Sequence, residues 1–309
     1  MDGLTLLYKL NQTLQEDSVT SGFLDTRTSY DYIYEAAVEF VKQTACISNT
    51  QDITTVAETS NYDLAYDYMM MFMRDSNNEF FVKYYDTSAY TSINFREYGA
   101  VRASNNTTST SIPWSFSIVD DRTAETIVTG TTTSAGASSG GESTLTDAAA
   151  TFTANPGDTV HNTTDGSSGF VVSRTSTTAL VTALFNGTNN DWTSGDAYVI
   201  VMAPKKQLVV DPPSSTAGHT ITIEYICNPV PVYSSFRSYR IPPNYMPAIV
   251  KYAAWLYKYR DREPSFGDAW YKYWAAQVER AMNTELRAKH VNRFRVNMKR
   301  QAYKDQSYR

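Results

Sequence analysis

The sequence predicts an α+β protein in which N- and C-terminal helices form a helical bundle attached to an antiparallel β region. Three observations support this prediction. Apolar residues recur at helical spacing near both ends, they alternate with a period of two in the middle, and a stretch rich in Thr and Gly interrupts that middle section. The interruption is too long for a structureless loop, so the β region is expected to carry an inserted small β-sandwich or barrel domain.

Two helices are expected in the first 50 residues, over 3–16 and 29–46. Each segment repeats apolar residues at the spacing of a half-buried helix. Thr28, with Asp31 three residues later, offers a variant of the capping box at the start of the second helix. The expected apolar stripes are Leu4, Leu7, Leu10 and Leu14 in the first helix, and Tyr30, Ile33, Tyr34, Ala37, Val41 and Ala45 in the second.

Three later segments alternate apolar and polar residues, as half-buried strands do. They are FFVKYYD at 80–86, PWSFSIVDD at 113–121 and TITIEYI at 220–226. The run YMMMFMR at 68–74 is expected to be a buried strand rather than a methionine-rich docking surface, because it is short and polar turns flank it. The middle of the chain is therefore predicted to be a sheet.

The segment from about Thr131 to Val201 has the pattern of an inserted domain. It begins with the linker-like TTTSAGASSGG and continues with four short apolar runs separated by Pro-Gly, Asp-Gly and Asn-Gly turn signals. After it, strand-like residues lead into YRIPPNYMPAIVKYAAWLYKYRD at 239–261, which reads as a helix beginning near Pro243. A further helix is expected over 267–286, after the short turn REPSFG.

The helix that begins near Pro243 has two apolar faces. One carries Met246, Ile249, Val250, Ala253, Leu256 and Tyr257, and the other carries Tyr252, Trp255 and Tyr259. A surface helix normally has charged residues on its second face, so either a larger intramolecular core or a neighbouring subunit must cover these three rings.

The patterns together predict six parts of the chain. They are helices of the bundle at 1–50, the first part of the β region at 51–130, the inserted β domain at 131–203, the second part of the β region at 204–238, further helices of the bundle at 239–286, and a basic C-terminal tail at 287–309.

Charge is distributed unevenly along the chain, whose net charge is −5. From Arg287 onward eight Lys or Arg stand against one Asp, about +7, which leaves about −12 on the preceding residues. The tail interleaves these cations with Phe294 and Tyr303, a pattern that suits nucleic-acid phosphates, an acidic protein groove or a merely solvated terminus. Because the acidic body would repel DNA, docking on an acidic protein is favoured.

The start of the chain has no secretory leader, and no run of about 18 apolar residues occurs, which predicts folding in a cytosol and no membrane-spanning helix. Cys46 and Cys227 are too few for a disulfide framework and are expected to be buried thiols.

The residues that usually carry catalysis are scattered or sit in turn sequences. Phosphate-binding, dinucleotide-binding and zinc-protease motifs are missing, so the chain is expected to be no enzyme and to hold no cofactor and no metal. The acids stand beside Gly, Asn and Pro, where carboxylates bind local backbone. The candidate residues for catalysis or metal binding are His161, His219 and His290, and the acids Asp120, Asp121, Asp158, Asp165, Asp191 and Asp196.

Four segments in a fixed order resemble the head-to-tail adaptor (connector) proteins of tailed bacteriophages. They are DITTVAETSNYDLAYDYMMMFM, PWSFSIVDD, QLVVDPPSSTAGHTITIEYICNPVP and the helical pair YRIPPNYMPAIVKYAAWLYKYRD…AWYKYWAAQVERAM. The resemblance covers about residues 1–125 and 205–290, and none of the segments is catalytic. The insert separately resembles a small β module that recurs in phage structural proteins.

This resemblance implies a structural virion protein that forms a ring, commonly a dodecamer, between the portal protein and a tail or nozzle protein. The implied location is the virion neck, after assembly in the host cytoplasm, with DNA passing through the channel without sequence-specific binding. The implied subunit interface is Tyr252, Trp255 and Tyr259, and the implied portal-docking residues are Arg287, Lys289, Arg293, Phe294, Arg295, Lys299, Arg300 and Tyr303.

Two other functions remain open at this point. The insert could recognise host carbohydrate through Trp192 or nearby aromatic residues, or it could act as a glycosidase through a pair of its carboxylates.

Overall fold

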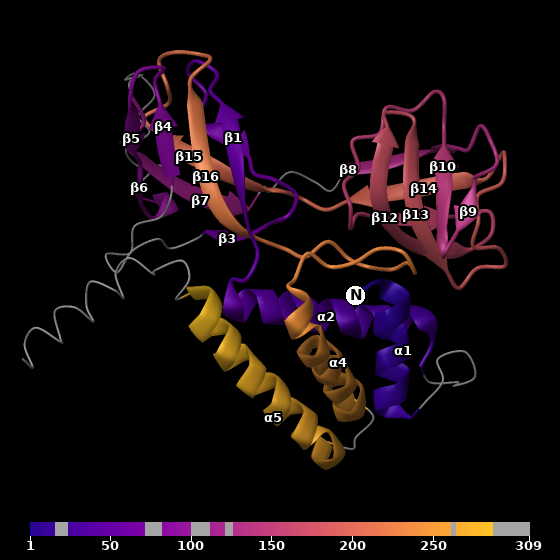
Figure 1. Ribbon diagram of the computed structural model, residues 1–309. Coiled ribbons are helices and arrows are strands. Elements are labelled where there is room, and N and C mark those ends of the chain that lie inside the picture. The colour runs from indigo at the N-terminus through magenta and orange to yellow at the C-terminus, as the bar shows by residue number, and fades with distance from the viewer. Residues whose placement is uncertain (16–23, 72–81, 100–111, 121–125, 261–263, 287–309) are drawn as a thin grey trace, which may run out of the picture. The chain divides into compact units, whose positions relative to one another are not determined.

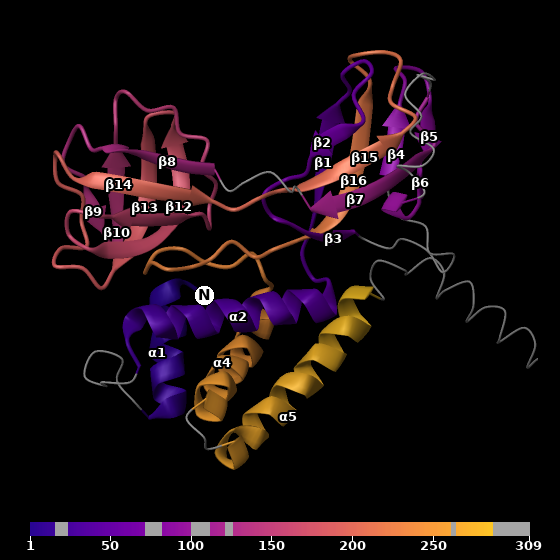
Figure 2. The same cartoon turned by 180° about the vertical axis from the view of Figure 1, so that it is seen from behind.

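The structure is a computed structural model that describes residues 1–15, 24–71, 82–99, 112–120, 126–260 and 264–286. The chain divides into two compact units. Among the described residues, the helical unit contains 5–47, 240–260 and 264–286, and the β unit contains residues from 2–4 and 48–239. Figure 1 shows the elements of both units, and Figure 2 shows them from behind.

The predicted fold class, a helical bundle with an attached β region, is wrong. The described residues form sixteen strands in three sheets against four α-helices, so the fold is mostly β-sheet. Periodicity underestimated the strands because a strand of two or three residues is too short to show alternation. Four strands are of this kind: β2 (Asn61–Asp63), β5 (Tyr90–Ser92), β6 (Asn94–Phe95) and β9 (Ser138–Ser139).

The helical unit contains segments from both ends of the chain. Its helices are α1 (Gly3–Leu14), α2 (Thr26–Thr44), α4 (Met246–Arg260) and α5 (Pro264–Ala281), with a 3-10 turn at Pro243–Tyr245 and a π-helical turn at Met282–Leu286. Edge-to-face packing of Tyr32 on Tyr257 joins α2 to α4, with ring centroids 6.1 Å apart.

The start of α2 differs from the predicted one. Asp25 is the N-cap, and its Oδ1 accepts a hydrogen bond from the backbone N–H of Thr28 at 2.6 Å. A carboxylate suits this position because it satisfies a free N–H and faces the positive end of the helix dipole. Thr28 is therefore inside the helix and is not its cap.

The buried stripe of α1 also differs from the predicted one. Leu6, Leu10 and Leu14 are buried, whereas Leu4 is 57% exposed. The buried leucines are therefore spaced four residues apart. The predicted stripe, which mixed steps of three and four residues from Leu4, was wrong at Leu4. In α4, by contrast, all six residues of the expected core face are buried, namely Met246, Ile249, Val250, Ala253, Leu256 and Tyr257.

Two of the three sheets in the β unit are built from strands on both sides of the insert. One has the order β1-β16-β4-β5 with β3 also paired to β16, and the other has the order β2-β15-β7-β6. The new bounds are β1 (Ser48–Thr54), β3 (Tyr68–Met71), β4 (Val82–Tyr85), β7 (Ser115–Asp120), β15 (Lys206–Asp211) and β16 (Thr220–Cys227). We call these two the host sheets.

The insert replaces the loop of a hairpin in one host sheet. β7 and β15 are antiparallel neighbours, and Asp120 at the end of β7 lies opposite Lys206 at the start of β15. Their side chains form an ion pair of 2.7 Å. The chain therefore leaves the host sheet and returns to it at one point, so the β7–β15 ladder continues without interruption.

The third sheet, which we call the barrel, has seven strands in the order β8-β14-β11-β12-β13-β10-β9. They curve around a shared centre in Figures 1 and 2. Trp192 is the largest fully buried side chain of the core that fills this centre. The bounds are β8 (Thr126–Thr131), β10 (Glu142–Thr146), β11 (Thr159–Asn162), β12 (Ser167–Ser176), β13 (Ala179–Phe185) and β14 (Ala197–Met202).

The two glycines of SSGGES, which read as linker in the sequence, form a hairpin turn. Ser139 pairs with Glu142, so Gly140 and Gly141 are the two loop residues between β9 and β10. Their φ angles are +62° and +84°, which the tight hairpin turn requires and which glycine adopts without steric cost.

Candidate functional site

The predicted portal-docking residues lie outside the described residues. All eight belong to the segment 287–309, and His290 lies there too. Their role stays a prediction from the sequence.

The predicted interface residues of α4 lie in an aromatic cluster shared with α5. Tyr252 stacks on Trp274 with ring centroids 4.3 Å apart, and Trp255 contacts Tyr271 at 4.9 Å. Gly267 at the start of α5 allows this approach, since a Cβ there would lie 2.9 Å from the Trp255 ring. The second apolar face of α4 is therefore covered in part by the chain's own next helix, as Figure 1 shows for α4 and α5 side by side.

Part of the cluster remains open to solvent. Tyr259 is 59% exposed and Tyr271 is 42% exposed, and both rings flank Trp255, at 5.4 and 4.9 Å between centroids. We call Trp255, Tyr259 and Tyr271 the aromatic patch. Tyr271 was not among the interface residues predicted from the sequence, which all belong to α4. The missed signal is that Tyr271 lies three residues before Trp274, within reach of the same face of α4.

The electrostatics of the cluster involve α2. Burial raises the pKa of Tyr252 above its ordinary value, and the negative charges of Glu39 and Glu35 raise it further. Tyr252 thus stays neutral at physiological pH, and its hydroxyl lies near an acidic edge of α2. On the α5 side, Lys251 lies over the ring of Trp270 at 5.7 Å.

The acids considered for catalysis serve as structural groups. Asp158 accepts backbone N–H bonds from Asn155 at 2.7 Å and from Ala203 at 3.0 Å. Asp196 accepts bonds from both the backbone N–H and the hydroxyl of Thr193. This is the turn chemistry that the sequence predicted.

The remaining candidate acids lie at hairpin ends, in loops or outside the described residues. Asp120 pairs with Lys206, Asp165 accepts a bond from the Asn162 amide, the carboxylate of Asp191 lies at a partly buried loop position, and Asp121 lies outside the described residues.

Two histidines lie in the described β unit. The Nδ1 of His219 bonds the hydroxyl of Tyr84, which also bonds Ser214 Oγ at 2.9 Å. Ser214 and Tyr84 are buried, so this chain of polar groups supports a turn and offers no surface nucleophile. His161 lies in β11 of the barrel. Within the described part of the chain, no group of three or more His, Cys, Asp or Glu is placed to hold a metal ion.

Trp192, the residue considered for carbohydrate recognition, is 1% exposed. Its indole N–H donates to Thr182 Oγ1 at 2.8 Å, inside the barrel core. Sugar stacking needs an open aromatic face, and the ring of Trp192 presents none. Of the two expected buried thiols, Cys227 is buried and Cys46 is partly exposed.

No protein family matches the chain, and no curated protein sequence matches it. Among the described helices, none combines the length and the apolarity needed to cross a membrane.

Proposed function

We propose that this chain is a structural virion protein of a tailed bacteriophage, which forms a dodecameric ring between the portal and the tail or nozzle protein. The ring leaves a channel through which DNA passes without sequence-specific binding. On this proposal the protein works at the virion neck, is assembled in the host cytoplasm, and has no enzymatic activity.

The observation that carries the proposal is the aromatic patch beside the tightly packed rings of α4 and α5. Tyrosine and tryptophan are enriched at the centres of protein interfaces, because they bury much apolar area at a small cost in side-chain entropy. Tyr259 and Tyr271 already contact the ring of Trp255, so little side-chain entropy would be lost on binding. A contact between this patch and a different surface of the next copy would be heterologous, and such contacts form a ring when the rotation from copy to copy closes.

The charge distribution supports the proposed division of roles. The body before Arg287 carries about −12, so a channel wall made from it would not neutralise phosphates and would not retain DNA. The tail carries about +7 and suits an acidic surface on the portal. The order of the four sequence segments, which resembles that of adaptor proteins, adds support from the sequence.

The first experiment measures the native mass of the full-length chain and of a chain ending at Leu286, each alone and mixed with the cognate portal protein. We expect the full-length chain to join the portal as a multi-copy ring and the shortened chain to fail. A full-length chain that remains a monomer and does not bind portal contradicts the proposal.

A second experiment tests the patch. The double variant Tyr259→Ala/Tyr271→Ala should lose ring formation, since it removes two exposed interface rings. Tyr273→Ala is the matched control, because Tyr273 lies on the same helix with a similar exposure of 43% and contacts no ring in the described structure. Thermal unfolding of each variant separates lost assembly from lost folding. Equal ring formation by the double variant and the control would exclude the patch as the interface.

The carbohydrate-binding alternative loses Trp192, since its ring is enclosed by the barrel core, and would have to act through nearby aromatic residues instead.

A further inference from the structure

The segment 228–238, which we call the strap, follows β16 of a host sheet and lies against the barrel. Tyr233 stacks on Phe170 of β12 with ring centroids 4.3 Å apart and planes 15° apart, and it meets Phe185 of β13 edge-on at 6.1 Å. Val232 and Tyr233 are 2% and 4% exposed, although they belong to no helix or strand. Contacts with the barrel therefore bury Tyr233, and the strap is also bonded to the start of the chain, where the N–H of Gly3 donates to the carbonyl oxygen of Arg237 at 2.8 Å.

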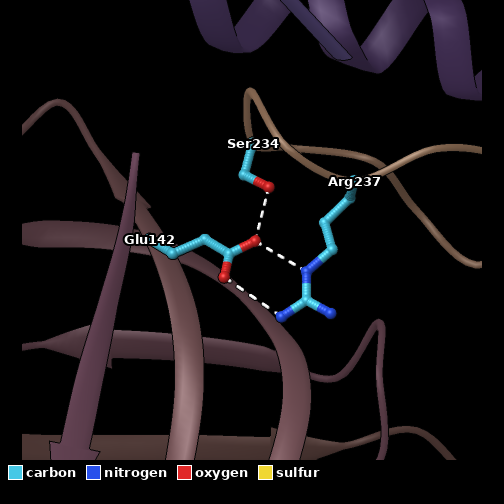
Figure 3. A network of polar contacts seen from close by, with 3 residues as sticks. All are labelled: Glu142, Ser234 and Arg237. Carbon is cyan, nitrogen blue, oxygen red and sulfur yellow. Dashed lines mark hydrogen bonds and ion pairs between the residues drawn. The ribbon is translucent and has the colours of Figure 1, made fainter. Parts of the chain in front are cut away.

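A polar network fixes the next residues of the strap. Figure 3 shows the guanidinium of Arg237 facing both carboxylate oxygens of Glu142, at 2.8 Å from Nε to Oε1 and 3.1 Å from Nη2 to Oε2. The hydroxyl of Ser234 donates to Oε1 at 2.5 Å. Such a two-point contact defines the position of both groups. Glu142 begins β10, so the network ties the strap to the barrel's glycine hairpin.

The backbone and shape of that hairpin also fit the strap. The N–H of Ser235 donates to the carbonyl oxygen of Gly140 at 2.9 Å. A Cβ on Gly140 would lie 2.2 Å from the ring of Phe236, so only glycine permits this approach. The positive φ of Gly140 and its missing side chain thus serve both the turn and the strap.

The position of the strap matters because of how the barrel is attached. The two covalent connections leave the host sheet at paired residues, Asp120 and Lys206, so they attach the barrel at a single place. The strap arrives from β16, which belongs to the other host sheet. A second attachment at a separate place restrains rotation of the barrel about the first.

We propose that the strap is a latch that locks the barrel to the host sheets, and that the Glu142–Ser234–Arg237 network is its releasable part. With the latch closed, the barrel is carried at one fixed angle. With the latch open, it swings on the Asp120–Lys206 hinge. This inference concerns the β unit alone and does not depend on ring formation or on the portal.

The latch is tested by hydrogen exchange on the full-length chain. In the unaltered protein we expect the amide of Ser235 to exchange slowly. Arg237→Ala should speed its exchange at least about fivefold, since it removes two charge-assisted hydrogen bonds. Arg240→Ala, which removes an exposed arginine three residues away, should leave it unchanged. If the exchange rate of the Ser235 amide is unchanged in Arg237→Ala, the proposal is overturned. It is also overturned if the barrel-core amides accelerate equally, because the barrel itself would then have unfolded.

A distance measurement tests the locking directly. Spin labels are placed at Thr129 on β8 of the barrel and at Thr91 on β5 of a host sheet, both exposed, with labelled chain diluted into unlabelled chain. We expect a narrow distance distribution in the unaltered protein, a broad one in Arg237→Ala and a narrow one in Arg240→Ala. A distribution that is already broad in the unaltered protein refutes the latch.

Discussion

The hydrogen bond that holds Trp192 in the barrel core gives the sharpest test of the structure. Its indole N–H donates to Thr182 Oγ1 at 2.8 Å, and the Thr182 hydroxyl donates to the carbonyl oxygen of Ser143 at 3.0 Å. Thr182 is fully buried and Trp192 is 1% exposed, so water cannot replace either bond. Thr182→Val keeps the shape of the side chain and removes the hydroxyl.

The expected cost of Thr182→Val follows from the two bonds. The stranded indole N–H costs about 1–3 kcal/mol, and the lost bond to Ser143 costs about 1 kcal/mol. The barrel should therefore lose about 2–4 kcal/mol of unfolding free energy, less a few tenths for the higher strand propensity of valine. In a Trp192→Phe background no indole donor is left to strand, so the same substitution should cost only about 1 kcal/mol.

The assay is native-state hydrogen exchange of the β11 and β12 amides with increasing denaturant, in the parent chain, both single variants and the double variant. Thr129→Val, on an exposed position of β8, is the control for the change from threonine to valine and should shift stability by less than about 0.5 kcal/mol. If the two costs add without a coupling energy of about 1 kcal/mol, the indole–hydroxyl bond contributes nothing and the description of the core is wrong.

Three further outcomes are expected. Burial alone would raise the pKa of Glu142, but hydrogen bonds from Arg237 and Ser234 outweigh burial and lower the pKa. The ionised carboxylate therefore stabilises the latch at pH values above the ordinary glutamate pKa of about 4.3, and the latch should weaken as the pH falls below that value. Strap exchange followed against pH, with Glu142→Gln as a variant that should lack this dependence, checks the sign. Glu39→Gln should lower the pKa of Tyr252, as measured by NMR titration of its ring, and an unchanged pKa would mean that α2 does not face it. Replacing residues 121–205 by Asn-Gly should leave a β7–β15 hairpin and folded host sheets, seen by circular dichroism, whereas global unfolding would show that the insert is needed for folding.

Sequence reasoning succeeded where the cause of structure is local. The core face of α4 follows from its helical period, and the acids of the insert bind backbone in the turns where Gly and Asn stand beside them. It failed where the cause is a distant partner. The helical bundle was overestimated because strands of two or three residues leave no periodic trace and pair across long stretches of chain.

The candidate sites show the same limit. Tyr252 and Trp255 were found by their spacing, but only the fold shows that α5 covers much of them and leaves Tyr259 and Tyr271 exposed. Glu142 was not among the predicted site residues, since nothing near it in sequence indicates an arginine 95 residues later.

The hairpin that carries the insert makes the protein modular. Closing a longer loop costs only about 0.6 kcal/mol for each doubling of its length, and a folded insert whose two ends already lie one strand spacing apart avoids most of that cost. Any compact domain with adjacent ends could therefore occupy the position between Asp120 and Lys206 without disturbing the sheet. Such a replacement would lack the surface that fits the strap, so it would be tethered and free to turn. A single genetic exchange could thus replace the inserted domain. The strap, which is distant in sequence, would then have to change as well before the new domain is held at a fixed angle.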